Sequence, residues 1–379
     1  MPEPLVVGVP RESKADEHRV AITPDGVREV EQHRVEVLIE SGAGVDSGFA
    51  DDAYVSAGAE IVVAAAEVWE RADIVCKVKE PLEHEFPLMR PGLCLFTYLH
   101  LAAYPDVADA LLERKVVGIA YETVQLASGA LPLLAPMSEV AGRMSVQIGA
   151  HFLEKHNGGR GVLLGGAPGV RPGRVVVLGA GNVGWNAGWM AAGLESDVDL
   201  IDRDVDRLRF VDQVQMGRIK TLASNRGVIE RTVPEADLLI GAVLVPGGRA
   251  PVLVDEDLVR AMKPGSVIVD IAIDQGGCIA TSHETTHHDP VFEKHGVVHY
   301  GVGNIPGAVP NTSTYALTNV TLPYLVELAR LGVTDAVARD AALRLGVNTA
   351  DGHLVNPAVA EALGKPHSVL AEVLAPPLR

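Results

Sequence analysis

Short apolar segments alternate with amphipathic segments along most of the chain. In the first third, apolar runs of strand length occupy residues 5–12, 35–41, 73–79, 93–100 and 116–122. Buried parallel strands are typically continuous apolar runs, and their alternation with helices indicates βαβ units. Thr23 followed by Pro24 predicts the start of the first helix, because threonine is a good N-cap and proline suits the first helical position.

The pattern changes between residues 127 and 173 and then resumes. Residues 137–156 predict a long amphipathic helix, which a glycine-rich connection follows. A second series of predicted strands then occupies residues 174–181, 197–202, 236–243, 266–272 and 297–303. We therefore expect an α/β protein with two Rossmann-like doubly wound domains. Residues 129–307 would form a domain inserted into the other, which comprises residues 1–128 and 308–379 and is completed by C-terminal helices.

Composition and charge narrow the class of protein. The 379 residues include 32 Lys and Arg against 49 Asp and Glu, a formal net charge of −17 that disfavours nucleic acid and anionic membranes as partners. The chain starts without a basic segment before a long apolar run, and no apolar run approaches the roughly 18 residues of a membrane span. We expect a cytoplasmic protein. Its three cysteines are too few for a disulfide framework, and Cys76 and Cys94 fall inside predicted strands.

A glycine motif is the most specific chemical signal in the chain. Gly179, Gly181 and Gly184 form G-x-G-x-x-G directly after an apolar run and at the start of a predicted helix. Such glycines permit a tight turn, close approach of a pyrophosphate and close packing of helix on strand. Asp202, 21 residues after Gly181, lies where a carboxylate binds the adenosine ribose. This favours NAD as the cofactor of the domain 129–307, and the adjacent Arg203 leaves NADP as an alternative.

Two other motifs carry less weight. Residues 283–287 spell H-E-x-x-H, which binds zinc when both histidines lie on one face of a helix. The surrounding Thr, Gly and Asp-Pro residues favour a surface loop instead, so we predict no metal site. The second glycine cluster, at residues 301–307, has the wrong spacing for a dinucleotide loop and contains Pro306.

Polar residues follow several predicted strands. Lys79 and His100 end two of them, Asp274 follows another, and Arg19 comes shortly after the first. Ligands of Rossmann-like sheets bind at the carboxyl ends of the strands. Lysine and arginine can hold a carboxylate, while histidine and aspartate can transfer protons near neutral pH. Together with the dinucleotide motif, these residues predict amino-acid or keto-acid chemistry.

Over essentially its whole length the chain resembles the alanine dehydrogenase family. The stretches that carry the resemblance are EHRVAITP at 17–24, KVKEP at 77–81, LFTYLHLA around His100, AYETVQ at 120–125, LPLLAPMSEVAGR at 131–143, DIAIDQGG at 270–277 and TSTYALTN at 312–319. The resemblance implies reversible, NAD-dependent oxidative deamination of L-alanine to pyruvate and ammonium, with hydride transfer from Cα to nicotinamide C4 through an imine. It also implies a homo-oligomer, typically a hexamer.

The resemblance further implies roles for individual residues. His100 and Asp274 would be the catalytic pair, Arg19 and Lys79 would bind the substrate, and Met137 would line the substrate pocket. The positions that match cofactor contacts are Ser138, Gly179, Gly181, Asn182, Val183, Gly184, Asp202, Arg207, Ser224, Val243, Leu244, Val302, Gly303, Asn304 and Ile305.

Two alternatives remain at this point. The NAD-binding component of a proton-pumping transhydrogenase resembles the same family, and so does a dehydrogenase that reduces the imine of a keto acid with ornithine or lysine. The presence of both His100 and Asp274 favours the alanine enzyme. The chain departs from many relatives at residues 195–196, where it has Glu-Ser, and carries bulky Trp185 and Trp189 after the glycine loop. These departures bear on cofactor affinity.

Overall fold

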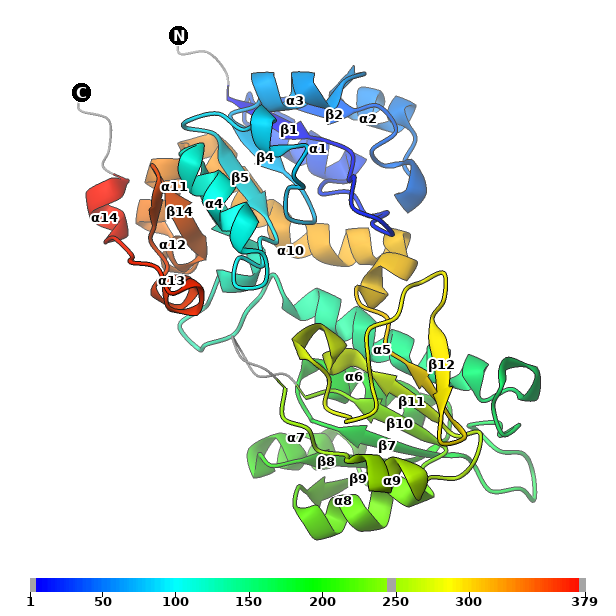
Figure 1. Cartoon of the computed structure of the whole chain (residues 1–379). Helices are drawn as coiled ribbons and strands as arrows, with labels where there is room; N and C mark the ends of the chain where they lie inside the picture. Colours follow the sequence, from blue (N-terminus) through cyan, green and yellow to red (C-terminus); the bar gives the residue numbers. More distant parts are fainter. Residues whose placement is uncertain (1–4, 244–249, 375–379) are drawn as a thin grey trace. The chain divides into compact units, whose positions relative to one another are not determined.

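The computed structural model describes residues 5–243 and 250–374 (Figure 1). The chain forms two compact units: unit 1 comprises Met1–Pro136 and Val309–Arg379, and unit 2 comprises Met137–Ala308. Residues 129–136, grouped with the inserted domain in the sequence analysis, thus lie in unit 1. Each unit contains a parallel sheet with helices, so the predicted fold class is confirmed.

Unit 1 is built on an eight-stranded sheet in the order β15-β14-β6-β5-β4-β1-β2-β3. Its strands are β1 (Val6–Val9), β2 (Glu36–Glu40), β3 (Glu60–Val62), β4 (Ile74–Cys76), β5 (Cys94–Thr97), β6 (Val117–Ala120), β14 (Val347–Ala350) and β15 (His353–Leu354). The first six are parallel. Strand order reverses between β1 and β4, the kind of position at which doubly wound sheets bind ligands.

The first helix of unit 1 begins where the sequence predicts, at Thr23 and Pro24. Thr23 caps α1 (Pro24–Glu31) by accepting a hydrogen bond from the Gly26 amide at 3.2 Å. The other helices are α2 (Asp51–Ala57), α3 (Ala65–Arg71), α4 (Pro105–Glu113), α10 (Pro310–Leu331), α11 (Val333–Arg339), α12 (Ala341–Gly346), α13 (Pro357–Leu363) and α14 (Leu370–Val373). The thiols of Cys76 and Cys94 are fully buried in β4 and β5, as expected of core residues.

The sheet of unit 1 ends in a hairpin that the sequence pattern does not predict. Only helices were expected after residue 307, yet β14 pairs antiparallel with β6 and β15. The central residues of β14 are polar but fully buried. The Thr349 hydroxyl accepts a hydrogen bond from the Gly118 amide at 3.0 Å and donates one to the Val116 carbonyl at 3.0 Å. Hydrogen bonds to neighbouring strands, and not an apolar sequence, therefore define β14 as a strand.

Unit 2 has a seven-stranded sheet in the order β12-β13-β11-β10-β7-β8-β9. Its strands are β7 (Arg174–Leu178), β8 (Asp197–Asp202), β9 (Ile219–Ala223), β10 (Leu238–Gly241), β11 (Val267–Asp270), β12 (Val291–Lys294) and β13 (Val297–Tyr300). The helices are α5 (Ala135–Phe152), whose first two residues belong to unit 1, α6 (Asn182–Gly193), α7 (Val205–Gln215), α8 (Arg226–Thr232) and α9 (Glu256–Arg260). All pairs except β12·β13 are parallel.

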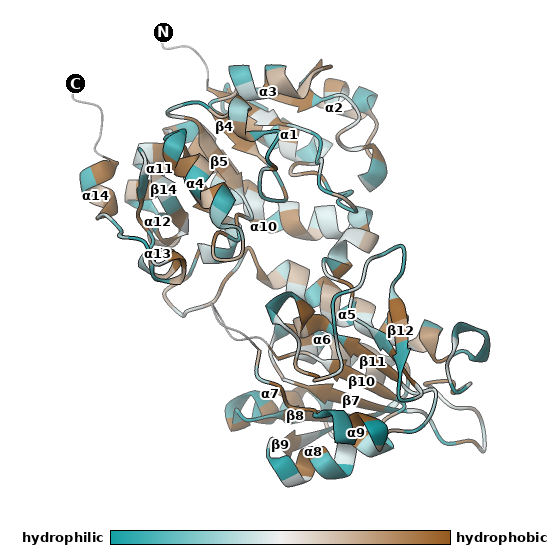
Figure 2. Cartoon of the chain, in the orientation of Figure 1, coloured by the Kyte–Doolittle hydropathy of each residue, from teal (hydrophilic) through white to brown (hydrophobic). Residues whose placement is uncertain are grey.

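The central strands of both sheets are largely hydrophobic (Figure 2). Residues of β4, β5, β6, β10 and β11 are buried throughout, as the continuous apolar runs predict. Among the described residues, no helix is long and apolar enough to cross a membrane.

Candidate active site

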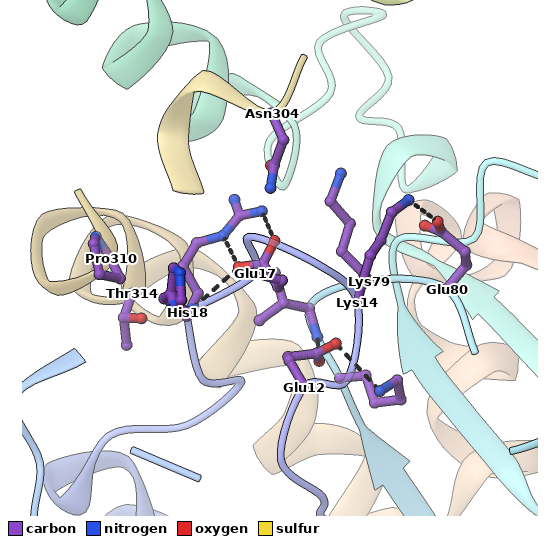
Figure 3. A network of polar contacts seen from close by, with 12 residues as sticks. Glu12, Lys14, Glu17, His18, Lys79, Glu80, Asn304, Pro310 and Thr314 are labelled. Carbon is purple, nitrogen blue, oxygen red and sulfur yellow. Dashed lines mark hydrogen bonds and ion pairs between the residues drawn. The ribbon is translucent and has the colours of Figure 1, made fainter. Parts of the chain in front are cut away.

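Polar side chains gather at the carboxyl edge of the sheet in unit 1. Arg19 lies in the loop after β1, Lys79 in the loop after β4, and His100 three residues after the end of β5. These three strands are neighbours in the order β5-β4-β1. Three of the predicted site residues, separated by up to 81 positions in the chain, therefore lie at one edge (Figure 3 shows the contacts of this region).

Arg19 is held by a carboxylate within its own loop. Its side chain is 2% exposed, and its guanidinium donates to both oxygens of Glu17, with Nε 2.6 Å from Oε1. The Arg19 amide donates to the same Oε1 at 3.1 Å. Burial raises the pKa of the Glu17 carboxyl, but Arg19 and Lys79 outweigh it and lower that pKa to about 2. The pair is therefore ionised, with the guanidinium fixed in orientation.

Lys79 is the second cation of this edge. Burial, followed by the neighbouring Arg19 charge, lowers the pKa of its ammonium group. The carboxylates of Glu17 and Glu80 favour the charged form of this group but do not offset the effect of burial. Lys14, drawn beside Lys79 in Figure 3, pairs with Glu80. An anion that binds here would meet a cation whose charge is incompletely neutralised.

His100 is fixed through its backbone as well as its ring. Its φ of +47° is unusual for a residue other than glycine. The Glu122 carboxylate accepts hydrogen bonds from the backbone amides of His100, at 2.6 Å, and Leu99, at 3.2 Å. The imidazole stacks on Tyr98, with ring centroids 5.6 Å apart, and is about one-third exposed. These contacts give the partly exposed ring a defined position.

The sequence analysis missed the acidic residues that support these groups. Glu17, Glu80 and Glu122 are site residues in the structure, and Glu17 and Glu80 are almost completely buried. Each lies inside a stretch that carries the family resemblance. Glutamate is usually exposed, however, so nothing local distinguishes a buried glutamate from a solvated one.

The glycine loop of unit 2 has the geometry that a dinucleotide requires. Gly179 has φ +106° and directly follows β7, and a Cβ at Gly184 would lie 1.8 Å from the Gly179 carbonyl oxygen. A Cβ at Gly181 would meet nothing nearer than the Arg207 side chain at 3.7 Å. Gly181 precedes α6 without a side-chain cap, so the amides of Asn182 and the following residues are available to an anion.

Asp202 lies at the end of β8 and links to this loop. Its Oδ2 accepts a hydrogen bond from the Ala180 amide at 2.5 Å, and its Oδ1 accepts one from Asp204 at 2.7 Å. The Ser224 amide, after β9, donates to the Asp202 carbonyl at 2.8 Å. The structure therefore brings Asp202, Ser224 and the glycine loop together, with Arg207 on the first turns of α7.

The remaining predicted contacts lie at other strand ends of unit 2. Val243 follows β10, beside Gly179, and Leu244 lies outside the described residues. Asp274 is exposed in a 3-10 helix (Ile271–Gln275) after β11, and its Oδ1 would lie 2.9 Å from a Cβ at Gly303. The segment from Val302 to Ile305 follows β13 and includes Gly303 and Asn304.

Met137 and Ser138 occupy the first turn of α5, which packs through Gly142 on the Val183 carbonyl.

The H-E-x-x-H segment is not helical. Residues 283–287 are irregular apart from an isolated bridge at Thr285, and His283 stacks on Phe292 with ring centroids 3.7 Å apart. The two histidines of the motif therefore do not share a helix face, and the described residues contain no cluster of three or more metal-ligating side chains.

Sequence comparison places this architecture in a family. The model of the N-terminal domain described as alanine dehydrogenase/PNT matches residues 8–141, and the model of the corresponding C-terminal domain matches residues 145–357. The chain belongs to the alanine dehydrogenase/PNT family. It is 57% identical to alanine dehydrogenase of Bacillus subtilis (strain 168) over 361 residues, which cover 95% of each protein.

Solved structures of the alanine dehydrogenase/PNT family agree with the fold. An L-alanine dehydrogenase superposes with a TM-score of 0.92 at 52% identity, over 95% of this chain and 99% of the other. A transhydrogenase from Sinorhizobium meliloti superposes with a TM-score of 0.80 at 24% identity, over 93% of this chain and 99% of the other. The latter likeness concerns the fold alone, so alanine dehydrogenases are the relevant comparison for chemistry.

Proposed function

We propose that this protein catalyses the reversible oxidative deamination of L-alanine. The balanced reaction converts L-alanine, NAD⁺ and water to pyruvate, ammonium, NADH and a proton. The chain is an oxidoreductase of the alanine dehydrogenase/PNT family with NAD as its cofactor, and its identity of 52–57% to alanine dehydrogenases favours this function over a transhydrogenase-like module. The observation that carries the proposal is the pair of cations at the β1/β4 edge, on a protein with a complete dinucleotide loop.

The geometry of unit 2 supports NAD at the glycine loop. The open side of Gly181 and the uncapped start of α6 would receive the pyrophosphate. Asp202 would accept hydrogen bonds from the adenosine ribose, and its negative charge disfavours a 2′-phosphate. Ser138, Asn182, Val183, Arg207, Ser224, Val243, Leu244 and the segment 302–305 are proposed to complete the contacts. When bound, NAD supplies the acceptor for the substrate hydride.

The geometry of unit 1 supports binding of an amino-acid carboxylate. Arg19 has one edge fixed by Glu17, which leaves its orientation set before the substrate arrives. Lys79 adds a second positively charged group at the same edge, which Glu17 and Glu80 stabilise only in part. A small substrate gains orientation from two such groups, and orientation supplies much of the rate acceleration of a hydride transfer. Met137 is proposed to line the pocket.

We assign proton transfer to His100 and Asp274. Loss of hydride from Cα gives an imine, and His100 would accept a proton from the water that adds to it and return one to the departing amine. Asp274 would orient that water or amine. Lys79 would stabilise negative charge on the oxygen of the intermediate.

NADH formation at alkaline pH tests the proposal. L-Alanine with NAD should give a rapid increase in NADH absorbance. Replacing L-alanine with D-alanine, glycine, serine or ornithine, or NAD with NADP, should give little increase. His100→Ala should lower kcat at least about 100-fold, since general acid-base catalysis contributes that much or more. Absence of reduction with L-alanine, while NAD still binds, would contradict the proposed reaction. Faster reduction with ornithine would instead identify the imine-reducing dehydrogenase.

We also propose that the protein is a cytoplasmic homo-hexamer. A hollow of about 710 Å³ in unit 2 is bordered by exposed Leu163 and Leu194, apolar surface that a second copy could cover. Light scattering should give six times the mass of one chain. A monomeric mass would contradict this part of the proposal.

A further inference from the structure

Two buried polar atoms near the proposed catalytic centre face each other. They are Nδ1 of His100 and Oε2 of Glu80, which lie 3.5 Å apart. Both atoms are inaccessible to solvent, and neither has a hydrogen-bond partner within normal geometry among the described residues. Buried donors and acceptors are rarely left without a partner, because each one costs free energy. The arrangement indicates that these two atoms pair with each other.

The other oxygen of Glu80 has a different partner. Its Oε1 is paired with the ammonium group of Lys14, which also contacts the Tyr104 hydroxyl at 3.3 Å and lies 4.8 Å from the centre of that ring. Lys14 therefore limits rotation of the carboxylate and leaves Oε2 directed at His100. The backbone of His100 is held independently by Glu122. The ring and the carboxylate are thus positioned by separate contacts.

We propose that Glu80 is a positioning residue that keeps His100 in the tautomer with its proton on Nδ1, so that Nε2 is the atom that exchanges protons with the substrate. This inference rests on the proposed function of His100. A neutral imidazole carries one proton on either nitrogen, and an adjacent carboxylate selects the nitrogen that donates to it. The aspartate of a serine-protease triad acts on its histidine in this way.

The charge state of Glu80 fits this role. Burial raises its pKa, but His100 and Lys14, with Lys79 nearby, lower it to about 2. Glu80 is therefore an ionised acceptor at neutral and alkaline pH. The separation of 3.5 Å is longer than an ordinary hydrogen bond, and catalytic hydrogen bonds often shorten only when the substrate is bound.

The tautomer of His100 tests the proposal directly. The full-length protein, labelled with ¹⁵N at its 13 histidines, would be measured by NMR at alkaline pH, with His100→Gln used to assign the resonances. The wild-type protein should carry the proton on Nδ1. A proton on Nε2 would overturn the inference, and this measurement needs no variant of Glu80 to fold.

Variants of Glu80 test the consequence for catalysis. Glu80→Gln should give a mixture of tautomers and a kcat lower by about 10- to 100-fold, a smaller loss than removal of the general acid-base group itself, with the KM for NAD unchanged. Glu80→Asp keeps a carboxylate and should recover part of the loss. Glu83→Gln, an exposed position in the same loop, should change neither property.

The results separate this inference from the proposed function. If Glu80→Gln keeps the wild-type tautomer and kcat while His100→Ala is inactive, His100 retains its role and the inference about Glu80 fails. If His100→Ala retains wild-type turnover, the proposed role of His100 fails first.

Discussion

The buried pair of Glu17 and Arg19 gives a quantitative prediction. Glu17→Gln removes the carboxylate but leaves the Arg19 guanidinium, 2% exposed, as a buried charge without its partner in the loop. The pKa of Glu17 is lowered from 4.5 to about 2. That fall corresponds to about 3 kcal/mol, at about 1.4 kcal/mol for each factor of ten in the acid constant. Removal of one partner of a buried ion pair typically costs about 3–5 kcal/mol, which agrees.

The assay follows the unfolding of unit 1 at pH 7. With Trp185 and Trp189 of unit 2 replaced by Phe, fluorescence reports on Trp69, which is fully buried in α3 of unit 1. In this background Glu17→Gln should lower the free energy of unfolding by about 3 kcal/mol in urea. Glu36→Gln, at an exposed position of β2, should change it by less than about 0.5 kcal/mol.

The pH dependence supplies an independent check. A carboxyl group whose pKa is lowered by folding contributes its full stability above its unfolded pKa, here 4.5, and loses it as the pH falls towards about 2. The difference in stability between wild type and Glu17→Gln should therefore shrink below pH 4.5. A difference under about 1 kcal/mol at pH 7, or one that grows in acid, would refute the assignment of Glu17 as an ionised partner of Arg19.

Three further substitutions test the proposed sites. Gly184→Ala places a Cβ 1.8 Å from the Gly179 carbonyl oxygen, so calorimetric titration should detect no NAD binding, and a wild-type Kd would contradict the close packing. Asp202→Ala should raise the KM for NAD about tenfold or more, because it removes a charge-assisted hydrogen bond to the ribose and leaves the Ala180 amide without its acceptor. An unchanged KM for NAD would exclude the ribose contact. Lys79→Met should lower kcat/KM for L-alanine about 100-fold, because the buried ammonium group is lost. Near-normal initial rates at low L-alanine concentration would show that Lys79 does not contact the substrate.

Local features of the chain were sufficient to predict most of the fold. The continuous apolar runs at residues 73–79 and 93–100 contain β4 and β5, because strands buried on both faces admit few polar residues. Thr23 predicted the start of α1 through its own hydrogen bond to a backbone amide. The glycine motif predicted the turn between β7 and α6, since its geometry depends on a few consecutive residues.

Features that depend on burial or on distant partners could not be predicted in this way. The polar strand β14 exists because Thr349 bonds to backbone groups of Gly118 and Val116, more than 200 positions earlier. Buried Glu17 and Glu80 look like ordinary surface residues in the sequence, and their role follows from the cations that the fold places beside them.

The sequence by itself therefore determined the alternation of strands and helices, the insertion of one domain in the other, the dinucleotide loop and the candidate residues at strand ends. These depend on hydropathy and spacing along the chain. Only the tertiary structure decided which candidates are neighbours. The order β5-β4-β1 brings the ends of three strands to one edge, and burial there makes the Glu17 and Glu80 carboxylates partners of Arg19, Lys14 and His100. Electrostatic partners are set by distance in space and by exclusion of water, and neither quantity is local in sequence.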